Sequence, residues 1–146
     1  MSHIEIVRLS EDMLSSVAQI EAECFAEPWG ESSLRLLLGE QGVAFVAIAS
    51  GRVVAYGGMM TVLDEGQITN IAVLSDFRRM GIGRRIMDTL EGFALEHGIS
   101  MLSLEVRESN LAARKLYVSC GWREEGIRKN FYRHPCENAV VMTKTL

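Results

Sequence analysis

The sequence predicts an α/β fold, a central mixed sheet flanked by helices. Short apolar or alternating segments typical of strands are interspersed with segments that have the three- and four-residue apolar spacing of helices. The chain has 146 residues, of which 48% are hydrophobic and 23% charged. This composition supports one buried core and excludes a disordered chain. We therefore expect a single domain over residues 1–146.

The first half of the chain contains signals for strands, helices and a hairpin. A strand is expected where Ile4 to Val7 alternates, and Ser10 is placed to cap a helix that Pro28 and Gly30 break. Ser50-Gly51 separates two strongly apolar strands, which predicts a hairpin. The expected elements, in order, are a strand at 4–7, a helix at 10–24, a short helix at 31–38, and strands at 43–49, 52–61 and 67–74.

The second half repeats a helix–strand pattern. A loop at 75–81 precedes a helix from about 83 to 97, which Gly98 ends, and Gly121 ends a later helix. The remaining expected elements are a strand at 101–106, a helix at 109–120 and a last strand at 139–144.

Charge and cysteine content narrow the possible functions. The chain has 15 Lys and Arg against 19 Asp and Glu, a net charge of −4, which argues against direct nucleic-acid binding. Eleven of the acidic residues and three of the basic ones precede residue 78, so the first half is acidic and the second half basic. An acidic half could steer a basic substrate, although a solvated helix face explains it as well. The three cysteines form no Cys-x-x-Cys pair, so no metal site is expected.

No membrane association is expected from the sequence. The longest apolar run, 43–49, is far shorter than the roughly twenty residues that span a bilayer, and the N-terminus lacks the order of a signal peptide. We therefore expect a cytoplasmic protein.

The segment from Arg78 to Arg85 predicts a phosphate site. It contains two glycines and four arginines between an expected strand and an expected helix. Backbone N–H groups at a helix N-terminus bind phosphate, glycines allow close approach, and arginines add charge-assisted hydrogen bonds. A tight turn before a solvated basic face is the structural alternative. A dinucleotide site is another, since Gly81-x-Gly83 opens a helix and Glu105 ends the next strand, but the third glycine of that motif is missing and no Walker loop is present.

The same residues resemble the acetyl-CoA signature of the GCN5-related N-acetyltransferase (GNAT) family. The resemblance spans nearly the whole chain, and within the family it is to the ribosomal-protein-alanine N-acetyltransferases. The motifs that carry it are Pro28-Trp29, Asn70-Ile71-Ala72-Val73, Arg78-x-x-Gly81-x-Gly83, Leu104-Glu105-Val106-Arg107-x-Ser109-Asn110, Ala113-x-x-Leu116-Tyr117-x-x-x-Gly121 and Asn130-Phe131-Tyr132.

The resemblance implies a role for each matching residue in binding acetyl-CoA. The loop would hold the pyrophosphate, and the strand edge would pair with the pantetheine arm. A backbone N–H at Val73 would polarise the thioester carbonyl, a contribution of ~3 kcal/mol by analogy with oxyanion holes. Taken alone, Asn110 reads equally well as a helix cap. The implied acetyl-CoA residues are Ile71, Ala72, Val73, Arg78, Arg79, Met80, Gly81, Ile82, Gly83, Arg84 and Asn110.

The resemblance also implies catalytic and acceptor-binding residues. Glu105 would accept a proton from the attacking amine, although an ion pair with an arginine is the structural alternative. Tyr117 would protonate the leaving thiolate, although it could be a core tyrosine. The implied peptide-groove residues are Phe25, Trp29, Asn130, Phe131 and Tyr132, the first two in the first interhelical loop and the others in the loop before the last strand.

These implications point to direct acetyl transfer to a protein N-terminus. The expected acceptor is the N-terminal alanine of a small-subunit ribosomal protein. An α-amine suits a modest base, because about a tenth of it is already neutral at pH 7, against well under ~0.1% of a lysine amine. A broader range of N-termini or small amines, and a non-catalytic acetyl-CoA sensor, are the alternatives.

Overall fold

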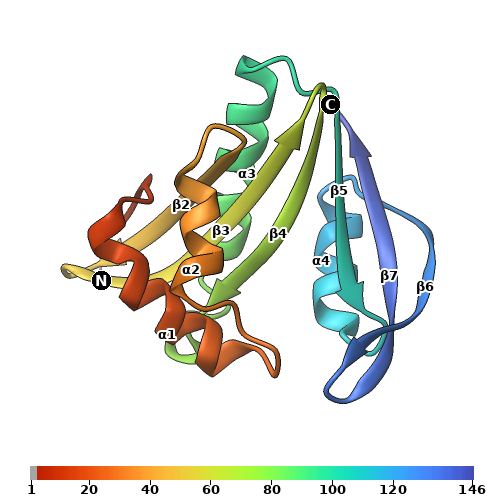
Figure 1. Cartoon of the computed structure of the whole chain (residues 1–146), viewed down its shortest axis with the longest axis horizontal. Coiled ribbons are helices and arrows are strands. Elements are labelled where there is room, and N and C mark those ends of the chain that lie inside the picture. The colour runs from red at the N-terminus through yellow and green to blue at the C-terminus, as the bar shows by residue number, and fades with distance from the viewer. Residues whose placement is uncertain (1–2) are drawn as a thin grey trace.

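A seven-stranded mixed sheet organises the computed structural model, which describes residues 3–146 (Figure 1). The strands lie in the order β1-β2-β3-β4-β5-β7-β6, and all pairs are antiparallel except β4–β5. In chain order the elements are β1 (Ile4–Arg8), the 3-10 turn η1 (Glu11–Met13), α1 (Leu14–Cys24), α2 (Glu31–Leu34), η2 (Arg35–Leu38), β2 (Gly42–Ala49), β3 (Arg52–Val62), β4 (Glu65–Val73), η3 (Ser75–Phe77), α3 (Ile82–Glu96), β5 (Met101–Arg107), α4 (Leu111–Ser119), β6 (Arg123–Arg133) and β7 (Cys136–Thr145).

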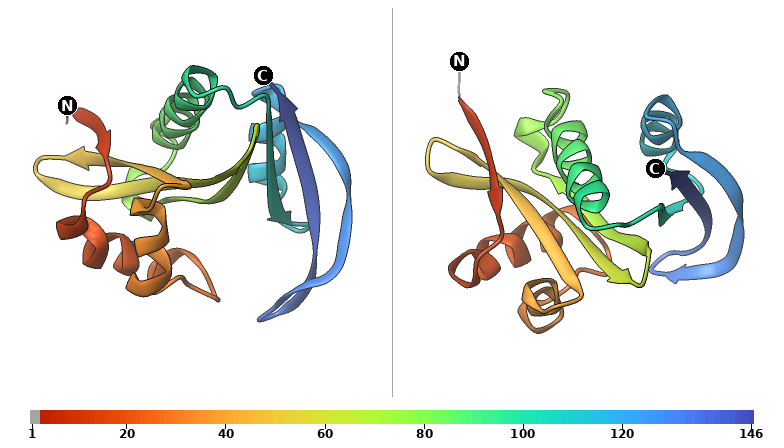
Figure 2. Two further views of the ribbon diagram at one scale, coloured as in Figure 1. Left: turned by 45° about the horizontal axis from the view of Figure 1, so that its top comes forward. Right: turned by 90° about the horizontal axis from the view of Figure 1, so that it is seen from above.

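Helices cover both faces of the sheet. The helices α1 and α2 lie on one face of the first four strands, and α3 packs on the other against β2, β3 and β4 (Figure 2). The helix α4 lies on the same side as α3 and contacts β6. Because β2 and β3 are covered on both faces, their sequences are almost continuously apolar and buried.

The sheet splits between β4 and β5. These parallel strands pair only where Glu65 to Gln67 lies beside Met101 to Ser103, and beyond that point they diverge (Figure 1). A register shift between β3 and β4 accompanies the split: Ile71 lies opposite Gly57, whereas Ile68 lies opposite Met59. The backbone of β4 from residue 68 onward therefore has a neighbouring strand on one edge only.

Most predicted elements are confirmed within a few residues, including the β2–β3 hairpin. Ser10 differs, because its hydroxyl donates to the Asp12 carboxylate and caps no helix N–H. The helix expected at 31–38 is one α-turn followed by a 3-10 turn.

One strand, β6, was not predicted. It is charged and exposed along nearly all of its length, so its sequence shows no buried face. Pairing with β7 forms it. Asn130, Phe131 and Tyr132, expected in a loop, therefore lie in this strand, at a register shift between Arg128 and Tyr132 where Asn130 has φ +54°.

No helix within residues 3–146 has the length and apolar character required to cross a bilayer.

Candidate active site

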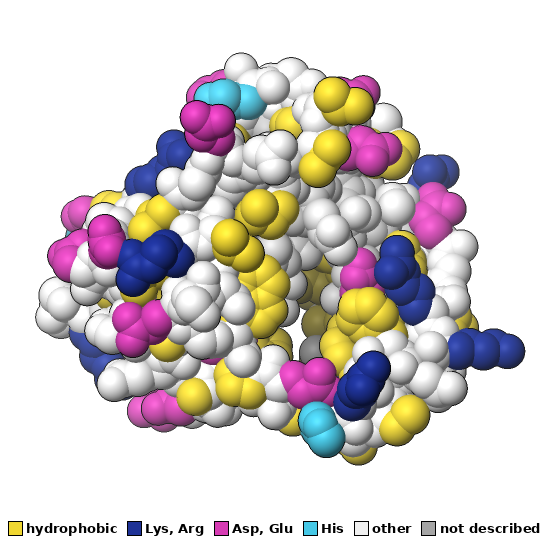
Figure 3. Space-filling view, viewed as in Figure 1, with side chains coloured by type: hydrophobic (Ala, Val, Ile, Leu, Met, Phe, Trp, Pro, Cys, Tyr) yellow, Lys and Arg dark blue, Asp and Glu magenta, His cyan; other side chains and the backbone are white. Residues whose placement is uncertain are grey.

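A cleft of about 640 Å³ lies where the sheet splits. Figure 3 shows the molecule hollowed between its two halves, with hydrophobic side chains along the hollow. The walls come from the α1–α2 loop, β4, β5, α4 and β6. Of the residues predicted from the sequence, the cleft is lined by Phe25, Trp29, Ile71, Glu105, Asn110, Tyr117, Phe131 and Tyr132.

The unpaired edge of β4 presents backbone donors to this split. The N–H of Leu74 donates to the Val54 carbonyl in β3 at 3.0 Å. Since successive residues of a strand direct their backbone groups to opposite edges, the N–H and carbonyl of Val73 point away from β3. Arg78 Nε donates to that carbonyl at 2.9 Å. The Val73 N–H, and that of Ile71 by the same alternation, are left to bind a ligand.

The loop after β4 brings a helix N-terminus beside this edge. Gly81 has φ +77° and Arg79 has φ +64°, so the chain turns through two left-handed residues before α3. The first helical bond runs from the Arg85 N–H to the Gly81 carbonyl, which leaves the N–H groups of residues 82–84 without helical partners. A Cβ on Gly83 would lie 3.7 Å from Val73 Cγ2, so the helix end packs directly on β4.

The four arginines of the loop divide into two groups. Arg78 is turned back onto Val73, and Arg85 Nη2 donates to the Ile4 carbonyl at 3.2 Å. Arg79 and Arg84 are exposed, and their guanidinium groups form no hydrogen bond or ion pair with another residue within 3–146. The charge available to a ligand here therefore comes from two arginines, fewer than the sequence indicated. Met80 is exposed. Ala72 is buried in the core and lies opposite Tyr56, so by the same alternation its backbone groups point toward β3 and not toward the free edge.

Glu105 projects into the cleft from β5. The strand alternates, with Leu102, Leu104 and Val106 buried and Glu105 on the opposite, half-buried face. Gln67 Nε2 donates to Glu105 Oε1 at 2.8 Å and approaches Oε2 at 3.4 Å. The expected alternative of an arginine ion pair is wrong, because the partner of this carboxylate is a neutral amide.

The helix α4 supplies Asn110 and Tyr117. Asn110 Oδ1 accepts the Ala113 N–H at 3.2 Å, so the predicted cap is confirmed. Tyr117 is half-buried, and its ring centroid lies 6.0 Å from that of Trp122. Burial raises the pKa of Tyr117 to about 12, so its hydroxyl stays protonated above the usual tyrosine pKa of about 10.

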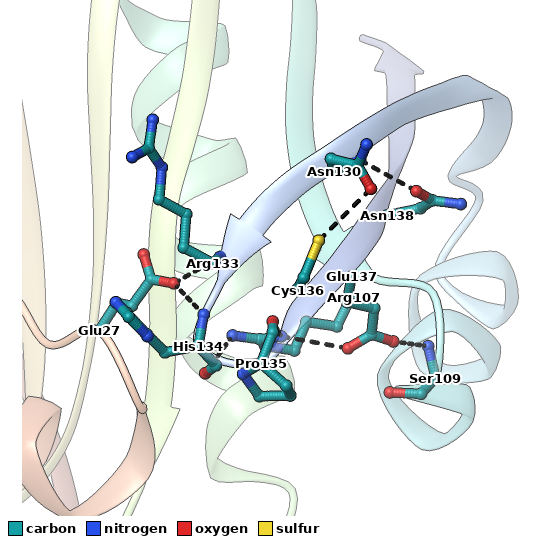
Figure 4. Close-up of polar contacts among 10 residues, drawn as sticks. All are labelled: Glu27, Arg107, Ser109, Asn130, Arg133, His134, Pro135, Cys136, Glu137 and Asn138. Carbon is teal, nitrogen blue, oxygen red and sulfur yellow. Dashed lines mark hydrogen bonds and ion pairs between the residues drawn. The ribbon is translucent and has the colours of Figure 1, made fainter.

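A hydrogen-bonded clasp joins the two sides of the cleft (Figure 4). Glu27, in the α1–α2 loop, accepts the backbone N–H groups of Arg133 at 2.7 Å and His134 at 2.8 Å. These bonds hold the pKa of Glu27 below its usual value. The clasp links the α1–α2 loop to the end of β6, the two regions that the resemblance places on either side of the peptide groove.

Arg107 and Glu137 lie beside the β6–β7 turn and hold it by hydrogen bonds (Figure 4). The Arg107 guanidinium donates to the carbonyls of Pro135 at 3.0 Å and His134 at 3.1 Å, and to Glu137 Oε1 at 3.1 Å. Glu137 Oε2 accepts the Ser109 N–H at 2.6 Å, and its bonds to Ser109 and Arg107 lower its pKa. The Arg107 guanidinium carbon also lies 4.3 Å from the centroid of the Tyr132 ring, which lines the cleft.

Asn130 is the one predicted peptide-groove residue that does not line the cleft. Its N–H donates to Asn138 Oδ1 at 3.0 Å, and its side-chain oxygen accepts from the Cys136 thiol at 3.4 Å (Figure 4). These contacts shape the irregular part of β6, and Phe131 and Tyr132 project from there into the cleft.

Comparison with known proteins identifies one family, both by a family model and by individual relatives. Residues 14–122 match the model of the acetyltransferase (GNAT) family. The chain is 37% identical over 131 residues to the [ribosomal protein bS18]-alanine N-acetyltransferase of Escherichia coli K12, covering 88% of each protein. It is 38% identical over 127 residues to the protein of that name from Haemophilus influenzae, covering 85% of this chain and 86% of the relative.

A solved structure is similar over almost the whole chain. The crystal structure of the ribosomal-protein-S18-alanine N-acetyltransferase from Escherichia coli superposes with a TM-score of 0.91 at 34% identity, covering 98% of this chain and 94% of that one.

Proposed function

The chain belongs to the acetyltransferase (GNAT) family, and from that premise we propose that it acetylates the N-terminal alanine of a small-subunit ribosomal protein of the bS18 kind. It is an acetyl-CoA-dependent N-acetyltransferase. The observation that carries the proposal is the convergence of three groups at the split of the sheet: the free edge of β4, Glu105 on β5 and Tyr117 on α4.

The backbone of the β4–α3 corner fits acetyl-CoA. The N–H groups of residues 82–84 and the positive end of α3 suit a pyrophosphate, and the exposed Arg79 and Arg84 add charge. The free edge of β4 runs from this corner into the cleft and suits the pantetheine amides. The free N–H groups of this edge, that of Val73 beside the corner and that of Ile71 farther into the cleft, are fixed donors, and one of them meets the thioester oxygen, where negative charge grows during transfer.

Glu105 and Tyr117 supply the two proton transfers. The Glu105 carboxylate accepts a proton from the incoming amine, either directly or through water. The Gln67 amide donates to the carboxylate, fixing its direction without neutralising its charge. The Tyr117 hydroxyl, which is protonated at neutral pH, donates to the thiolate as it leaves. Acetyl transfer is direct, with no acetylated enzyme.

The clasp favours an extended chain end as the acceptor. Glu27 joins the α1–α2 loop to the end of β6 by two hydrogen bonds, so these two segments together enclose the acceptor side of the cleft. Trp29, Phe131 and Tyr132 contribute flat apolar surface to this side. A peptide can insert its first residue between these walls and present its α-amine to Glu105.

Peptide acetylation tests the proposal directly. One peptide begins with a free alanine, and a matched peptide has a blocked N-terminus and an internal lysine. We expect acetyl transfer to the first peptide only, at a rate well above the uncatalysed one. Equal transfer to the lysine peptide would contradict the assigned acceptor, and no transfer to either would contradict the activity.

A further inference from the structure

A buried carboxylate lies behind the α1 side of the cleft. Glu21, on α1, is 0% exposed, and within residues 3–146 it is the one charged side chain that solvent does not reach. Its Oε1 accepts the backbone N–H of Trp29 at 2.8 Å. Its Oε2 accepts Asn70 Nδ2 at 2.8 Å and also the Tyr56 hydroxyl.

No cation compensates this carboxylate. The ion pairs among residues 3–146 do not include Glu21, so three neutral donors satisfy it. A buried carboxylate is strongly destabilising unless such donors are held in place. The donors come from the α1–α2 loop, from β3 and from β4, so the carboxylate joins three segments that are distant in the sequence.

Two of the three donors belong to cleft residues. Trp29 and Asn70 both line the cleft, whereas Tyr56 is 0% exposed and anchors the carboxylate in the core. A carboxylate can only accept hydrogen bonds, so the Asn70 side chain must turn its NH₂ group to Glu21. The carbonyl oxygen of Asn70 is then the atom free to face the cleft.

We propose that Glu21 is a positioning residue for the acceptor. It sets the orientation of the Asn70 amide, so that Asn70 Oδ1 accepts a hydrogen bond from an N–H of the incoming peptide end, and it holds Trp29 as the adjoining wall. This inference rests on the function proposed above, because it assigns the cleft beside Asn70 to the acceptor. The network reaches β4 only through the Asn70 side chain, so it leaves the backbone donors of Ile71 and Val73, assigned above to acetyl-CoA, unchanged.

The substitution Glu21→Gln tests the proposal. Glutamine keeps the shape and one acceptor oxygen, which can retain the Trp29 N–H, but its NH₂ group faces two donors. The Tyr56 hydroxyl can rotate to accept, whereas the Asn70 amide must flip and turn its own NH₂ group to the cleft. We expect the peptide KM to rise about tenfold, with kcat and the acetyl-CoA Kd nearly unchanged.

Glu23→Gln is the matched control, because Glu23 lies on the same helix and is exposed. It removes the same charge and should leave the peptide KM unchanged. The double variant Glu21→Gln/Asn70→Asp restores an acceptor opposite the glutamine NH₂ group and again presents an oxygen to the cleft. It should recover most of the wild-type KM, a rescue that a merely structural role of Glu21 does not predict.

Tryptophan fluorescence gives a readout independent of turnover. Trp122 is 2% exposed, so quenching by acrylamide reports mainly on Trp29. Greater quenching in Glu21→Gln than in Glu23→Gln would support the assignment. Wild-type quenching together with a wild-type KM would overturn it. Should wild-type protein transfer no acetyl group, the proposed function fails, and quenching alone still decides whether Glu21 holds Trp29.

If the Glu21→Gln protein does not fold, a second variant, Asn70→Leu, tests the proposal. Asn70→Leu leaves the buried carboxylate with two donors and removes only the amide that faces the cleft. We expect the same rise in peptide KM with the acetyl-CoA Kd retained. An unchanged KM in this variant would refute the role given to Asn70 and with it the positioning role of Glu21.

Discussion

Replacing Glu105 by glutamine isolates the proton-accepting step. The substitution preserves the shape of the side chain, and the glutamine oxygen can still accept from Gln67 Nε2, which lies 2.8 Å from Glu105 Oε1. The neighbouring core residues Leu104 and Val106 face the other side of β5 and are not disturbed. The variant therefore loses a base while the walls of the cleft remain.

The size of the effect follows from the acceptor's own pKa. A general base contributes roughly 10²–10⁴ in rate. A peptide α-amine titrates at about 7.7–8.0, so about a tenth of it is neutral at pH 7 and most of it at pH 9. We expect kcat of Glu105→Gln to fall about 100-fold at pH 7 and only about tenfold at pH 9, because the amine then needs little help to lose its proton.

Mass spectrometry of the acetylated peptide, with initial rates at both pH values, measures this effect. Calorimetry should show an unchanged acetyl-CoA Kd. Glu65→Gln is the control, since Glu65 is exposed on the adjacent strand β4 and its loss should leave kcat unchanged. Wild-type kcat in Glu105→Gln at pH 7 would refute the assigned role. An equal loss at both pH values would show that the carboxylate does not act on the ammonium form.

Three further predictions concern Tyr117 and the phosphate loop. Tyr117→Phe should lower kcat about 100-fold with the acetyl-CoA Kd retained, measured by the same assay, and an unaltered kcat would remove its role as proton donor. Because the pKa of Tyr117 is raised to about 12, its acid form persists above the usual value near 10, so wild-type kcat should not decline between about pH 8 and about pH 10; a decline there would place the donor elsewhere. Gly81→Ala should cost ~1 kcal/mol of stability, because Gly81 has φ +77°, and should weaken acetyl-CoA binding. The control Gly92→Ala lies inside α3 with open space around the new methyl group, so it should stabilise the fold by ~1 kcal/mol and leave binding unchanged. Equal acetyl-CoA affinities of the two variants by calorimetry would contradict the loop assignment.

The strands and helices that bury an apolar face could be predicted from the sequence. The apolar runs of β2 and β3 and the periodic apolar residues of α3 carry their own signal, because burial selects them directly. The strand β6 carries no such signal. Its residues are charged and exposed, and only the neighbouring β7 makes it a strand, so a local pattern could not reveal it.

The parts of the site that depend on a short, local sequence pattern could be predicted. The loop glycines and arginines marked the start of α3, and the polar residue in an apolar strand marked Glu105. Contacts between distant residues could not be predicted, since Gln67 meets Glu105, and Glu27 meets the end of β6, only after the chain folds. The same holds for Glu21, which reads as one acidic residue of a solvated helix face although it is fully buried.

The measurement that tests the central claim most directly is the intact mass of purified small-subunit ribosomal proteins after incubation with this protein and acetyl-CoA. We expect one protein to gain a single acetyl group, which fragmentation places on the α-amine of an N-terminal alanine. Acetylation of many N-termini would contradict the narrow acceptor. The absence of any acetylated protein, with acetyl-CoA bound, would contradict the proposed function itself.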